Sequence, residues 1–203
     1  MTTRLGPGER PSPAQQVVGR VPARGYGPAA AYCPRCAADL PGPPPTRCRR
    51  CAYELFHNAR PAVNVVLLDS VGTRFLAIRR ARAPQAGHWE TPGGFCDGAE
   101  HPRVAAEREC REELGVEVRL GELIGLYLGE YEYQDETLSV LECFYLATVR
   151  QGEVRLDHSE ATEAAWFALD EPPPLAFATM DAAVRDVAAG GRALRDAAGS
   201  SGR

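Results

Sequence analysis

The sequence contains no apolar run approaching the roughly 20 residues that a helix needs to cross a bilayer. It also lacks the pattern of a secretory signal, because the arginines near its start are not followed by an apolar segment. A basic excess is absent too: the formal net charge is −4 at pH 7, whereas nucleic-acid-binding chains are normally basic. We therefore expect a cytoplasmic protein that has no membrane partner. We do not expect it to bind nucleic acid.

Large apolar side chains are scarce at the start of the chain. Residues 1–30 are rich in Pro, Gly, Arg and Ala and cannot bury enough surface to offset the entropy lost on ordering, so we expect them to be disordered. At the other end, residues 178–189 predict a closing helix with an apolar face. The pair Gly190-Gly191 is expected to end this helix, and residues 191–203 to form a loose tail.

The seven cysteines are an odd number in a chain without an export signal, which argues against a disulfide framework. Four of them form two C-x-x-C pairs with eleven residues between the pairs. Such a set presents the four thiolates that Zn²⁺ prefers in closed structural sites, and a redox function is the alternative for a single pair. We predict a small zinc ribbon over residues 31–57, with the ligands Cys33, Cys36, Cys48 and Cys51.

The stretch 102–114 predicts a helix, because a proline begins it and a glycine follows its last residue. In that helix Glu109, Glu112 and Glu113 lie three or four residues apart and crowd one edge. Like charges at this spacing repel. A hard divalent cation removes the penalty, since Mg²⁺ favours carboxylate oxygen and keeps positions for water and phosphate. The alternative is a solvated acidic face with glutamate–arginine pairs.

The spacing around this helix resembles the Nudix box at every defined position. From Gly94 to Val116 the sequence reads GFCDGAEHPRVAAERECREELGV, with a glutamate after five further residues and the Arg-Glu pair after seven more. Nine constrained positions in a fixed frame are far more specific than a lone glycine motif. The resemblance implies a loop–helix–loop that holds Mg²⁺ or Mn²⁺ against the diphosphate of a nucleoside diphosphate linked to another group.

The resemblance also implies an α+β fold over residues 58–190, namely a Nudix α/β/α sandwich with a mixed sheet, preceded by the zinc ribbon. The residue patterns agree with this fold. Residues 62–69 and 73–80 predict a hairpin, and residues 118–133 and 138–149 are long β-rich runs.

By the same resemblance, Glu109, Glu112 and Glu113 hold the divalent metal, and Arg108 orients carboxylates through its planar fork rather than contacting the substrate. A metal in this position polarises a P–O bond and lowers the pKa of a bound water. That water attacks one phosphorus in line and expels the other phosphate.

Other positions of the motif have supporting roles. Glu100 is expected to brace the loop around the helix, and Gly93 and Gly94 to let the backbone approach metal and phosphate closely. Many Nudix enzymes bring one more glutamate from a distant loop as base or ligand. We expect Glu160 to be that residue, with Glu163 second; a different loop region offers Glu130, Glu132 and Glu136.

The ribbon before the Nudix domain resembles that of NADH pyrophosphatases and of ribbon-bearing ADP-ribose or FAD pyrophosphatase-like proteins. The SQPWPFPxS run of the NADH pyrophosphatases is missing, so ADP-ribose, FAD and NADH all stay open as substrates. The expected partner is a small-molecule nucleotide diphosphate, cleaved to a nucleoside monophosphate and a phosphorylated product; a homodimer is compatible with the sequence. The alternatives are a nucleoside-triphosphate pyrophosphatase that cleans the nucleotide pool and a non-catalytic nucleotide-sensing regulator.

Overall fold

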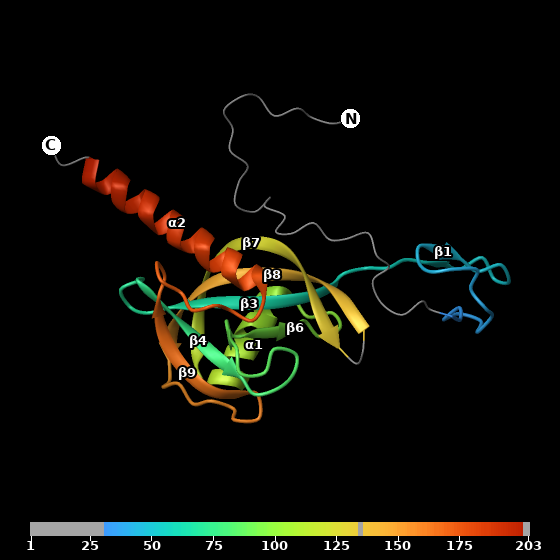
Figure 1. Ribbon diagram of the computed structural model, residues 1–203, viewed down its shortest axis with the longest axis horizontal. Coiled ribbons are helices and arrows are strands. Elements are labelled where there is room, and N and C mark those ends of the chain that lie inside the picture. The colour runs from blue at the N-terminus through green and yellow to red at the C-terminus, as the bar shows by residue number, and fades with distance from the viewer. Residues whose placement is uncertain (1–30, 134–135, 201–203) are drawn as a thin grey trace.

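The computed structural model describes residues 31–133 and 136–200, with side chains described up to residue 190. The predicted disorder of residues 1–30 therefore lies outside the described residues. The chain forms a small N-terminal ribbon and a larger domain, and the ribbon extends away from one side of that domain (Figure 1). No helix within the described ranges combines the length and the apolar character that a bilayer crossing requires.

The ribbon contains two short antiparallel strands, β1 (Thr46–Arg47) and β2 (Glu54–Leu55). The larger domain is built on a mixed sheet of seven strands. Only the pairing of β3 with β8 is parallel, and every other strand pair of this sheet is antiparallel. Its strands are β3 (Arg60–Leu68), β4 (Arg74–Arg80), β5 (Trp89–Glu90), β6 (Gly93–Phe95), β7 (Glu117–Tyr133), β8 (Glu136–Gln151) and β9 (Ala161–Ala168).

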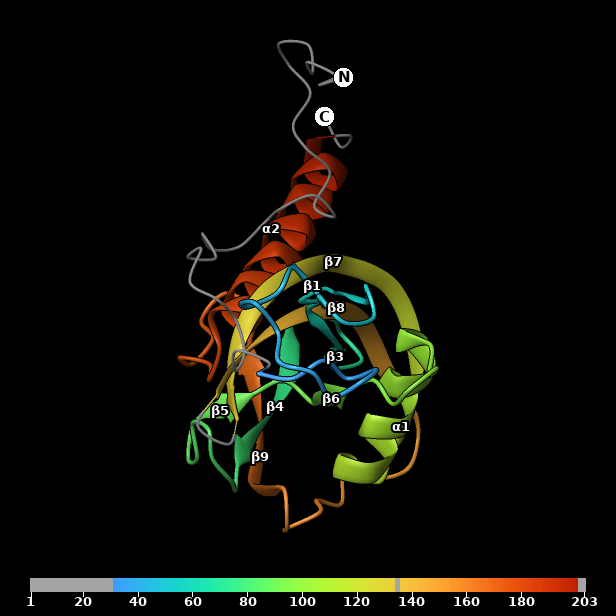
Figure 2. The ribbon, with the colours of Figure 1, turned by 90° about the vertical axis from the view of Figure 1, so that its right-hand side faces the viewer.

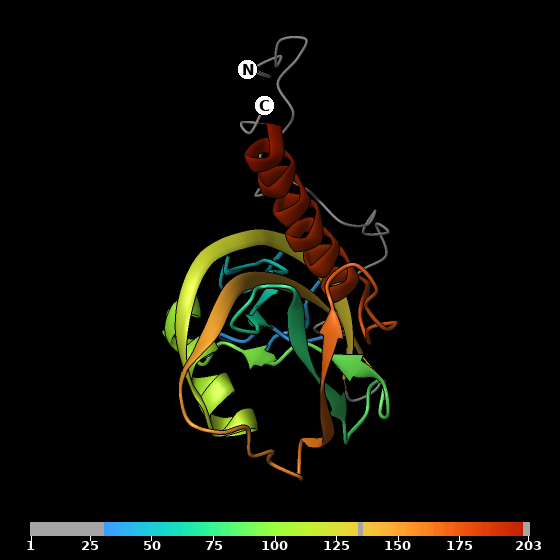
Figure 3. The same ribbon diagram turned by 90° about the vertical axis from the view of Figure 1, so that its left-hand side faces the viewer.

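Alternating residues of the central strand β3 face two different helices. Val63, Val65 and Leu67 are fully buried against α1 (Pro102–Leu114), whereas Val66 points to the opposite side and packs with α2 (Ala178–Ser200). Successive side chains of a strand point to opposite faces, and each fully buried Val or Leu contributes about 1.5–3 kcal/mol. The strongly curved sheet therefore lies between the two helices, as Figures 2 and 3 show from opposite sides. The predicted α+β sandwich is confirmed.

Helix α1 has the predicted bounds, and its ends are capped. The Nδ1 atom of His101 accepts a hydrogen bond from the backbone N–H of Arg103 at the start of the helix, with N and Nδ1 3.2 Å apart. At its end Gly115 has φ 66°, a left-handed conformation that glycine adopts without steric cost, and its N–H bonds the carbonyl of Arg111. The caps fix the direction of the helix that carries the acidic residues.

Helix α2 is longer than predicted. It runs through Gly190 and Gly191 to Ser200, although the glycine pair was expected to end it. Glycine inside a helix costs only about 1 kcal/mol relative to alanine. The following residues, RALRDAA, contain strong helix formers and no proline, so the two glycines are outweighed.

Candidate active site and zinc centre

Arg108 connects the acidic residues at the edge of α1. Its Nε and one terminal nitrogen donate to the two carboxylate oxygens of Glu100, at 3.0 and 2.9 Å. Its other terminal nitrogen donates to Glu109 at 2.8 Å and to Glu112 at 2.9 Å. These bonds, those to Glu100 above all, raise the pKa of Arg108, so it stays a cation. Arg108 lies where an orienting residue was predicted, and its bidentate partner is Glu100 rather than one of the predicted metal ligands.

Glu100 ties this arginine to the loop that precedes α1. One of its carboxylate oxygens accepts a hydrogen bond from the backbone N–H of Asp97 at 3.1 Å. The hydrogen bonds from Arg108 lower the pKa of Glu100, so the carboxylate is charged at neutral pH. Glu100 therefore connects Arg108 to the loop at which a bracing role was predicted for it, and that role stays a prediction.

The two glycines before the helix are in contact with its carboxylates. The N–H of Gly93 donates to Oε2 of Glu113 at 2.9 Å, and a β-carbon at Gly93 would lie 2.1 Å from the carbonyl oxygen of Val63. A β-carbon at Gly94 would lie 2.5 Å from Oε1 of Glu109. The glycines were predicted to let the backbone approach metal and phosphate. In the structure they let it approach the carboxylates themselves.

Two of the three helical glutamates are buried. Glu109 is 8% exposed and Glu113 is 5% exposed, while the side chain of Glu112 is more than half exposed. Burial raises the pKa of Glu113 well above its usual range, and the charges of Glu90 and Glu109 raise it further. Burial also raises the pKa of Glu109, against the opposing effect of Arg108. Carboxylate oxygens are the donors that Mg²⁺ and Mn²⁺ favour, so these residues are of the kind that would hold such a cation and gain the missing positive charge from it.

Glu160 approaches this cluster from the chain segment that precedes β9. Its backbone carbonyl accepts a hydrogen bond from the N–H of Ala81, which fixes the segment beside β4. The pKa values of Glu90, Glu109 and Glu113 are raised mainly by burial. The negative charge of Glu160 makes a smaller contribution in the same direction. The fold thus brings Glu160 within electrostatic reach of the helical glutamates, some 50 positions away in sequence.

Two of the other glutamates that the sequence offered in this role, Glu163 and Glu132, have different partners. Glu163 forms an exposed ion pair with Arg79 at 2.9 Å. Glu132 accepts a hydrogen bond from Thr137 at 2.7 Å within the β7–β8 hairpin. These contacts favour Glu160 over Glu163 and Glu132 as the distal glutamate.

Sequence reasoning missed Glu90, a buried residue of β5. Burial raises its pKa to about 7, although it is paired with the guanidinium of Arg80. Arg80 also donates to the carbonyl of Pro84 at 2.7 Å and lies over the ring of Phe177, 5.3 Å from the ring centre. The sequence contained one signal for it: Glu90 is a charged residue between Trp89 and the Gly-Gly loop, in a segment otherwise suited to a buried strand.

An aromatic group lies beside the Gly-Gly loop. The ring of Tyr131 stands edge-on to Phe95, with ring centres 5.5 Å apart, and lies 5.7 Å from Phe177. Its hydroxyl accepts a hydrogen bond from Arg80 at 3.4 Å. Since the carbonyl of Phe95 also binds Arg108, these rings are directly connected to the acidic site. The three half-buried rings offer planar surfaces to a ligand that reaches the glutamates.

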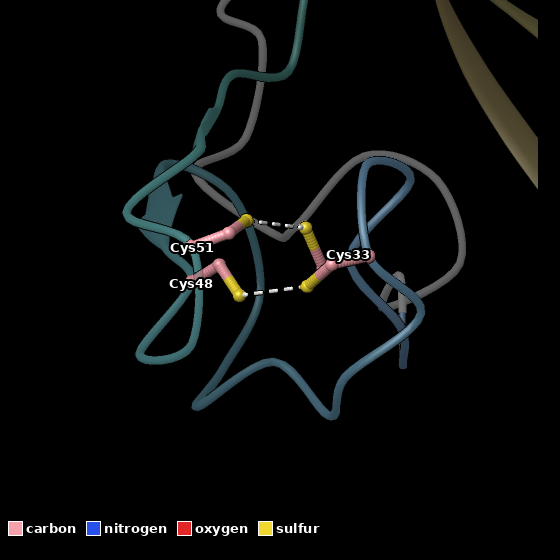
Figure 4. Close-up of side chains that lie close together, drawn as sticks. Cys33, Cys48 and Cys51 are labelled. Carbon is pink, nitrogen blue, oxygen red and sulfur yellow. Dashed lines mark hydrogen bonds between the residues drawn. The ribbon is translucent and has the colours of Figure 1, made fainter.

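The sulfurs of the four ribbon cysteines lie close together, and Figure 4 labels three of these residues, Cys33, Cys48 and Cys51. The sulfurs of Cys33 and Cys51 are 3.7 Å apart, as are those of Cys36 and Cys48, and all four lie within 4.8 Å of one another. A disulfide has a sulfur–sulfur distance of about 2.05 Å. A tetrahedral zinc site with Zn–S bonds of about 2.3 Å requires sulfurs about 3.8 Å apart. The arrangement therefore fits the predicted zinc ligands and excludes paired disulfides.

Each C-x-x-C pair closes a tight turn of the same form. The N–H of Ala37 donates to the carbonyl of Cys33 at 2.8 Å, and the N–H of Ala52 donates to that of Cys48 at 3.0 Å. Both alanines have positive φ, 56° and 59°. Backbone N–H groups, led by that of Cys51, lower the pKa of Cys48 to about 6, whereas at Cys51, against a backbone N–H that lowers it, burial and the neighbouring cysteines raise the pKa to about 11. The backbone therefore favours one thiolate in the cluster, and a bound metal would be needed to ionise the others.

A mixed sheet between two helices, with a glutamate-rich helix held by an arginine against a Gly-Gly loop, is the arrangement expected of a Nudix hydrolase. The NUDIX domain family matches residues 58–187, most of the chain, and the protein belongs to this family. Both the family prediction and the prediction of an enzyme are confirmed.

Known proteins agree with this assignment. Over 117 residues the chain is 32% identical to an ADP-ribose pyrophosphatase of Methanocaldococcus jannaschii, covering 58% of this chain and 68% of that protein. It is 34% identical over 109 residues to the mitochondrial NAD(P)H pyrophosphatase NUDT13 of Mus musculus, covering 53% of this chain and 29% of that protein. The crystal structure of a MutT NUDIX hydrolase from Burkholderia pseudomallei aligns with a TM-score of 0.54 at 29% identity, covering 64% of this chain and 99% of that one.

Proposed function

We propose that this chain hydrolyses the diphosphate linkage between a nucleoside and a second group, with ADP-ribose, FAD and NADH as the leading substrates. The products are a nucleoside monophosphate and a phosphorylated partner. The observation that carries the proposal is the buried pair Glu109 and Glu113, of which Arg108 binds the first and the Gly-Gly loop the second, with the charge of Glu160 within electrostatic reach. Two buried, mutually repelling carboxylates are costly unless a cation compensates them.

Mg²⁺ or Mn²⁺ held by Glu109, Glu112 and Glu113 would neutralise diphosphate charge and lower the pKa of a bound water. The protein's own residues prepare this site. Arg108 fixes two of the three carboxylates through one guanidinium nitrogen, which leaves their other oxygens for a ligand. The N–H of Gly93 holds Glu113 in place. Preorganisation of this kind lowers the barrier because no reorganisation is needed during the reaction.

Glu160 is the proposed base for the attacking water. Its segment is held to the end of α1, where the N–H of Asp157 donates to the carbonyl of Glu113 at 3.0 Å, and its charge acts on Glu113. A base in this position would accept the proton of the water that attacks the diphosphate. Glu163, which is engaged with Arg79, has no such part.

The aromatic group of Phe95, Tyr131 and Phe177 is the proposed site for the planar end of the substrate. A nucleobase or nicotinamide ring that stacks there remains close to the glutamates, because Phe95 is in contact with Arg108. The identified relatives, an ADP-ribose pyrophosphatase and an NAD(P)H pyrophosphatase, support a substrate with a diphosphate between two bulky groups. The ribbon is proposed to hold one structural Zn²⁺ and to have no part in the chemistry.

A substrate panel tests the proposal. ADP-ribose, FAD, NADH and several nucleoside triphosphates are incubated with Mg²⁺ or Mn²⁺, and the phosphate monoesters formed are measured through an added phosphatase. Glu113→Gln provides the background, and Glu163→Gln is the matched glutamate variant outside the site. We expect the highest kcat/KM for a dinucleotide or nucleotide sugar. Preference for triphosphates would favour a pool-cleaning enzyme, and no turnover of any compound would favour a nucleotide sensor.

A further inference from the structure

The described residues contain seven buried polar side chains, and they fall into two groups. Glu90, Glu109 and Glu113 belong to the candidate site. The remaining four form a continuous hydrogen-bonded chain that no sequence motif indicated. Its members are Asn64, Thr91, Glu142 and Thr179.

Glu142 of β8 is at the centre of this network. Its Oε2 accepts a hydrogen bond from Nδ2 of Asn64 at 2.9 Å, and the hydroxyl of Thr179 lies 3.0 and 3.1 Å from its two oxygens. Gly129 of β7 leaves the space for it, since a β-carbon there would lie 2.7 Å from Oε1 of Glu142. A buried carboxylate contributes little to stability relative to an apolar side chain of the same volume. Its presence here therefore calls for another physical reason.

The network leads from Glu142 to the Gly-Gly loop. The amide oxygen of Asn64 accepts a hydrogen bond from the hydroxyl of Thr91 at 3.2 Å. Thr91 immediately precedes Pro92, whose carbonyl bonds the N–H of Val65 at 2.9 Å. Asn64 is also the residue paired with Gly93 across β3 and β6, and a β-carbon at Gly93 would lie 2.8 Å from its Cα atom. Asn64 thus lies directly under the loop that holds Glu113.

The chemistry of the two side chains determines how Asn64 is oriented. Oε2 of Glu142 is the acceptor in this pair, so the NH₂ group of Asn64 must lie on its side. The amide oxygen must then face Thr91, whose hydroxyl can donate to it. Without the carboxylate the amide is free to rotate by half a turn, and Thr91 loses its fixed acceptor. A shift of about 1 Å in a positioning element can reduce a reaction rate by about a hundredfold.

We propose that Glu142 is a positioning residue for the hydrolysis, which acts through Asn64 and Thr91 on the Gly93 N–H that holds Glu113. The effect crosses the sheet, because Glu142 and Asn64 share the α2 side with Thr179 while Glu113 belongs to α1. This inference rests on the proposed function for its kinetic consequences. Its structural consequence, a fixed Gly93 N–H, does not depend on the identity of the substrate.

Exchanging the two interacting groups tests the proposal. Glu142→Gln replaces one of the two acceptor oxygens at the centre of the network by an NH₂ group, and Asn64→Asp places two carboxylates side by side. The double variant Glu142→Gln/Asn64→Asp restores one acceptor-only group and one amide in the reverse order. We expect each single change to lower kcat by about tenfold or more with a small change in KM, and the double variant to recover to within about threefold of wild type.

Amide hydrogen exchange at Gly93, followed by NMR without substrate, gives a readout that needs no turnover. Exchange is expected to accelerate in both single variants and to slow again in the double variant. Single variants with wild-type kcat and wild-type exchange at Gly93 would overturn the positioning role, whatever their melting temperatures. Suppose that wild type turns over none of the compounds while amide exchange at Gly93 still accelerates in the single variants and slows again in the double variant. In that case the proposed function fails and the positioning of Gly93 stands.

Discussion

Gly94 and Glu109 are so close that a β-carbon at position 94 would overlap the carboxylate, at 2.5 Å from Oε1 and 2.8 Å from Cδ. The obstructed group is the buried carboxylate that Arg108 orients, not a mobile surface side chain. The absence of a side chain at position 94 is therefore a requirement of the carboxylate cluster, and the backbone forms one wall of the site.

Gly94→Ala should displace Glu109 and lower kcat by about a hundredfold, because ligand geometry is lost. Steady-state kinetics over a range of Mg²⁺ concentrations measures the effect, and circular dichroism shows whether the fold remains. Gly190→Ala is the matched control, since nothing lies within 4 Å of the added carbon and alanine favours a helix. Wild-type kinetics of Gly94→Ala would contradict the arrangement described.

The carboxylates of α1 can be tested one at a time. Glu112→Gln or Glu113→Gln keeps the shape of the side chain and removes a charged ligand, so kcat should fall by at least about a hundredfold. Glu163→Gln, which alters only an exposed ion pair, should stay close to wild type. Near-normal turnover of both Glu112→Gln and Glu113→Gln would mean that the chemistry occurs elsewhere.

Glu160→Gln should lower kcat with little change in KM, because a base acts in the transition state and contributes little to substrate binding. A pH–rate profile compares this variant with wild type and with Glu163→Gln. The profile of Glu160→Gln should differ from that of wild type, because the variant lacks the proton acceptor, and the profile of Glu163→Gln should not. The assignment is refuted if Glu160→Gln is fully active while a glutamate of the β7–β8 hairpin proves essential.

Cys48→Ser should lose one equivalent of zinc and loosen the ribbon, since metal binding supplies the folding energy of a segment with so few core residues. The larger domain should remain folded because it has its own buried core. Elemental analysis and limited proteolysis test both expectations. Wild-type protein with far less than one zinc per chain would contradict the zinc prediction.

Stability should decrease with rising pH through the buried carboxylate of Glu142. Burial raises its pKa from 4.5 to about 7, so between these values the folded protein binds more protons than the unfolded chain. The contribution is fully present below pH 4.5 and is lost by about pH 7, with a magnitude of about 3 kcal/mol for one such group. Urea unfolding at pH 5 and pH 8 should therefore show a smaller difference for Glu142→Gln than for wild type. Glu163→Gln should behave like wild type. If the free energy of unfolding changed equally between pH 5 and pH 8 in all three proteins, Glu142 would not be the source of the pH dependence.

The sequence was sufficient for features that depend on local spacing. The bounds of α1, the two C-x-x-C turns and the β3–β4 hairpin all follow from caps, turns and alternation within short windows. Glu160 was selected from its position in an acidic loop, and the fold places its charge near Glu109 and Glu113.

Other features depend on contacts that no local pattern encodes. Glu90 belongs to the acidic cluster because β5 pairs with β4, and a lone glutamate in a short strand does not reveal this. The network of Glu142 joins residues from two strands, a loop and a helix. The predicted end of α2 was wrong, because the helix formers that follow the glycine pair outweigh the cost of the two glycines.

The parallel pairing of β3 with β8 determines the order in which the domain can be completed during synthesis. Arg60 lies opposite Val140, so the buried valines of β3 leave the ribosome long before their partner strand exists. Strand pairs separated this far in sequence form slowly, and unpaired apolar strands promote aggregation. A chain released after residue 133 would carry the complete glutamate motif on α1 and still lack β8. We therefore expect a fragment that ends at residue 133 to aggregate although it contains the whole motif, because β3 lacks its parallel partner.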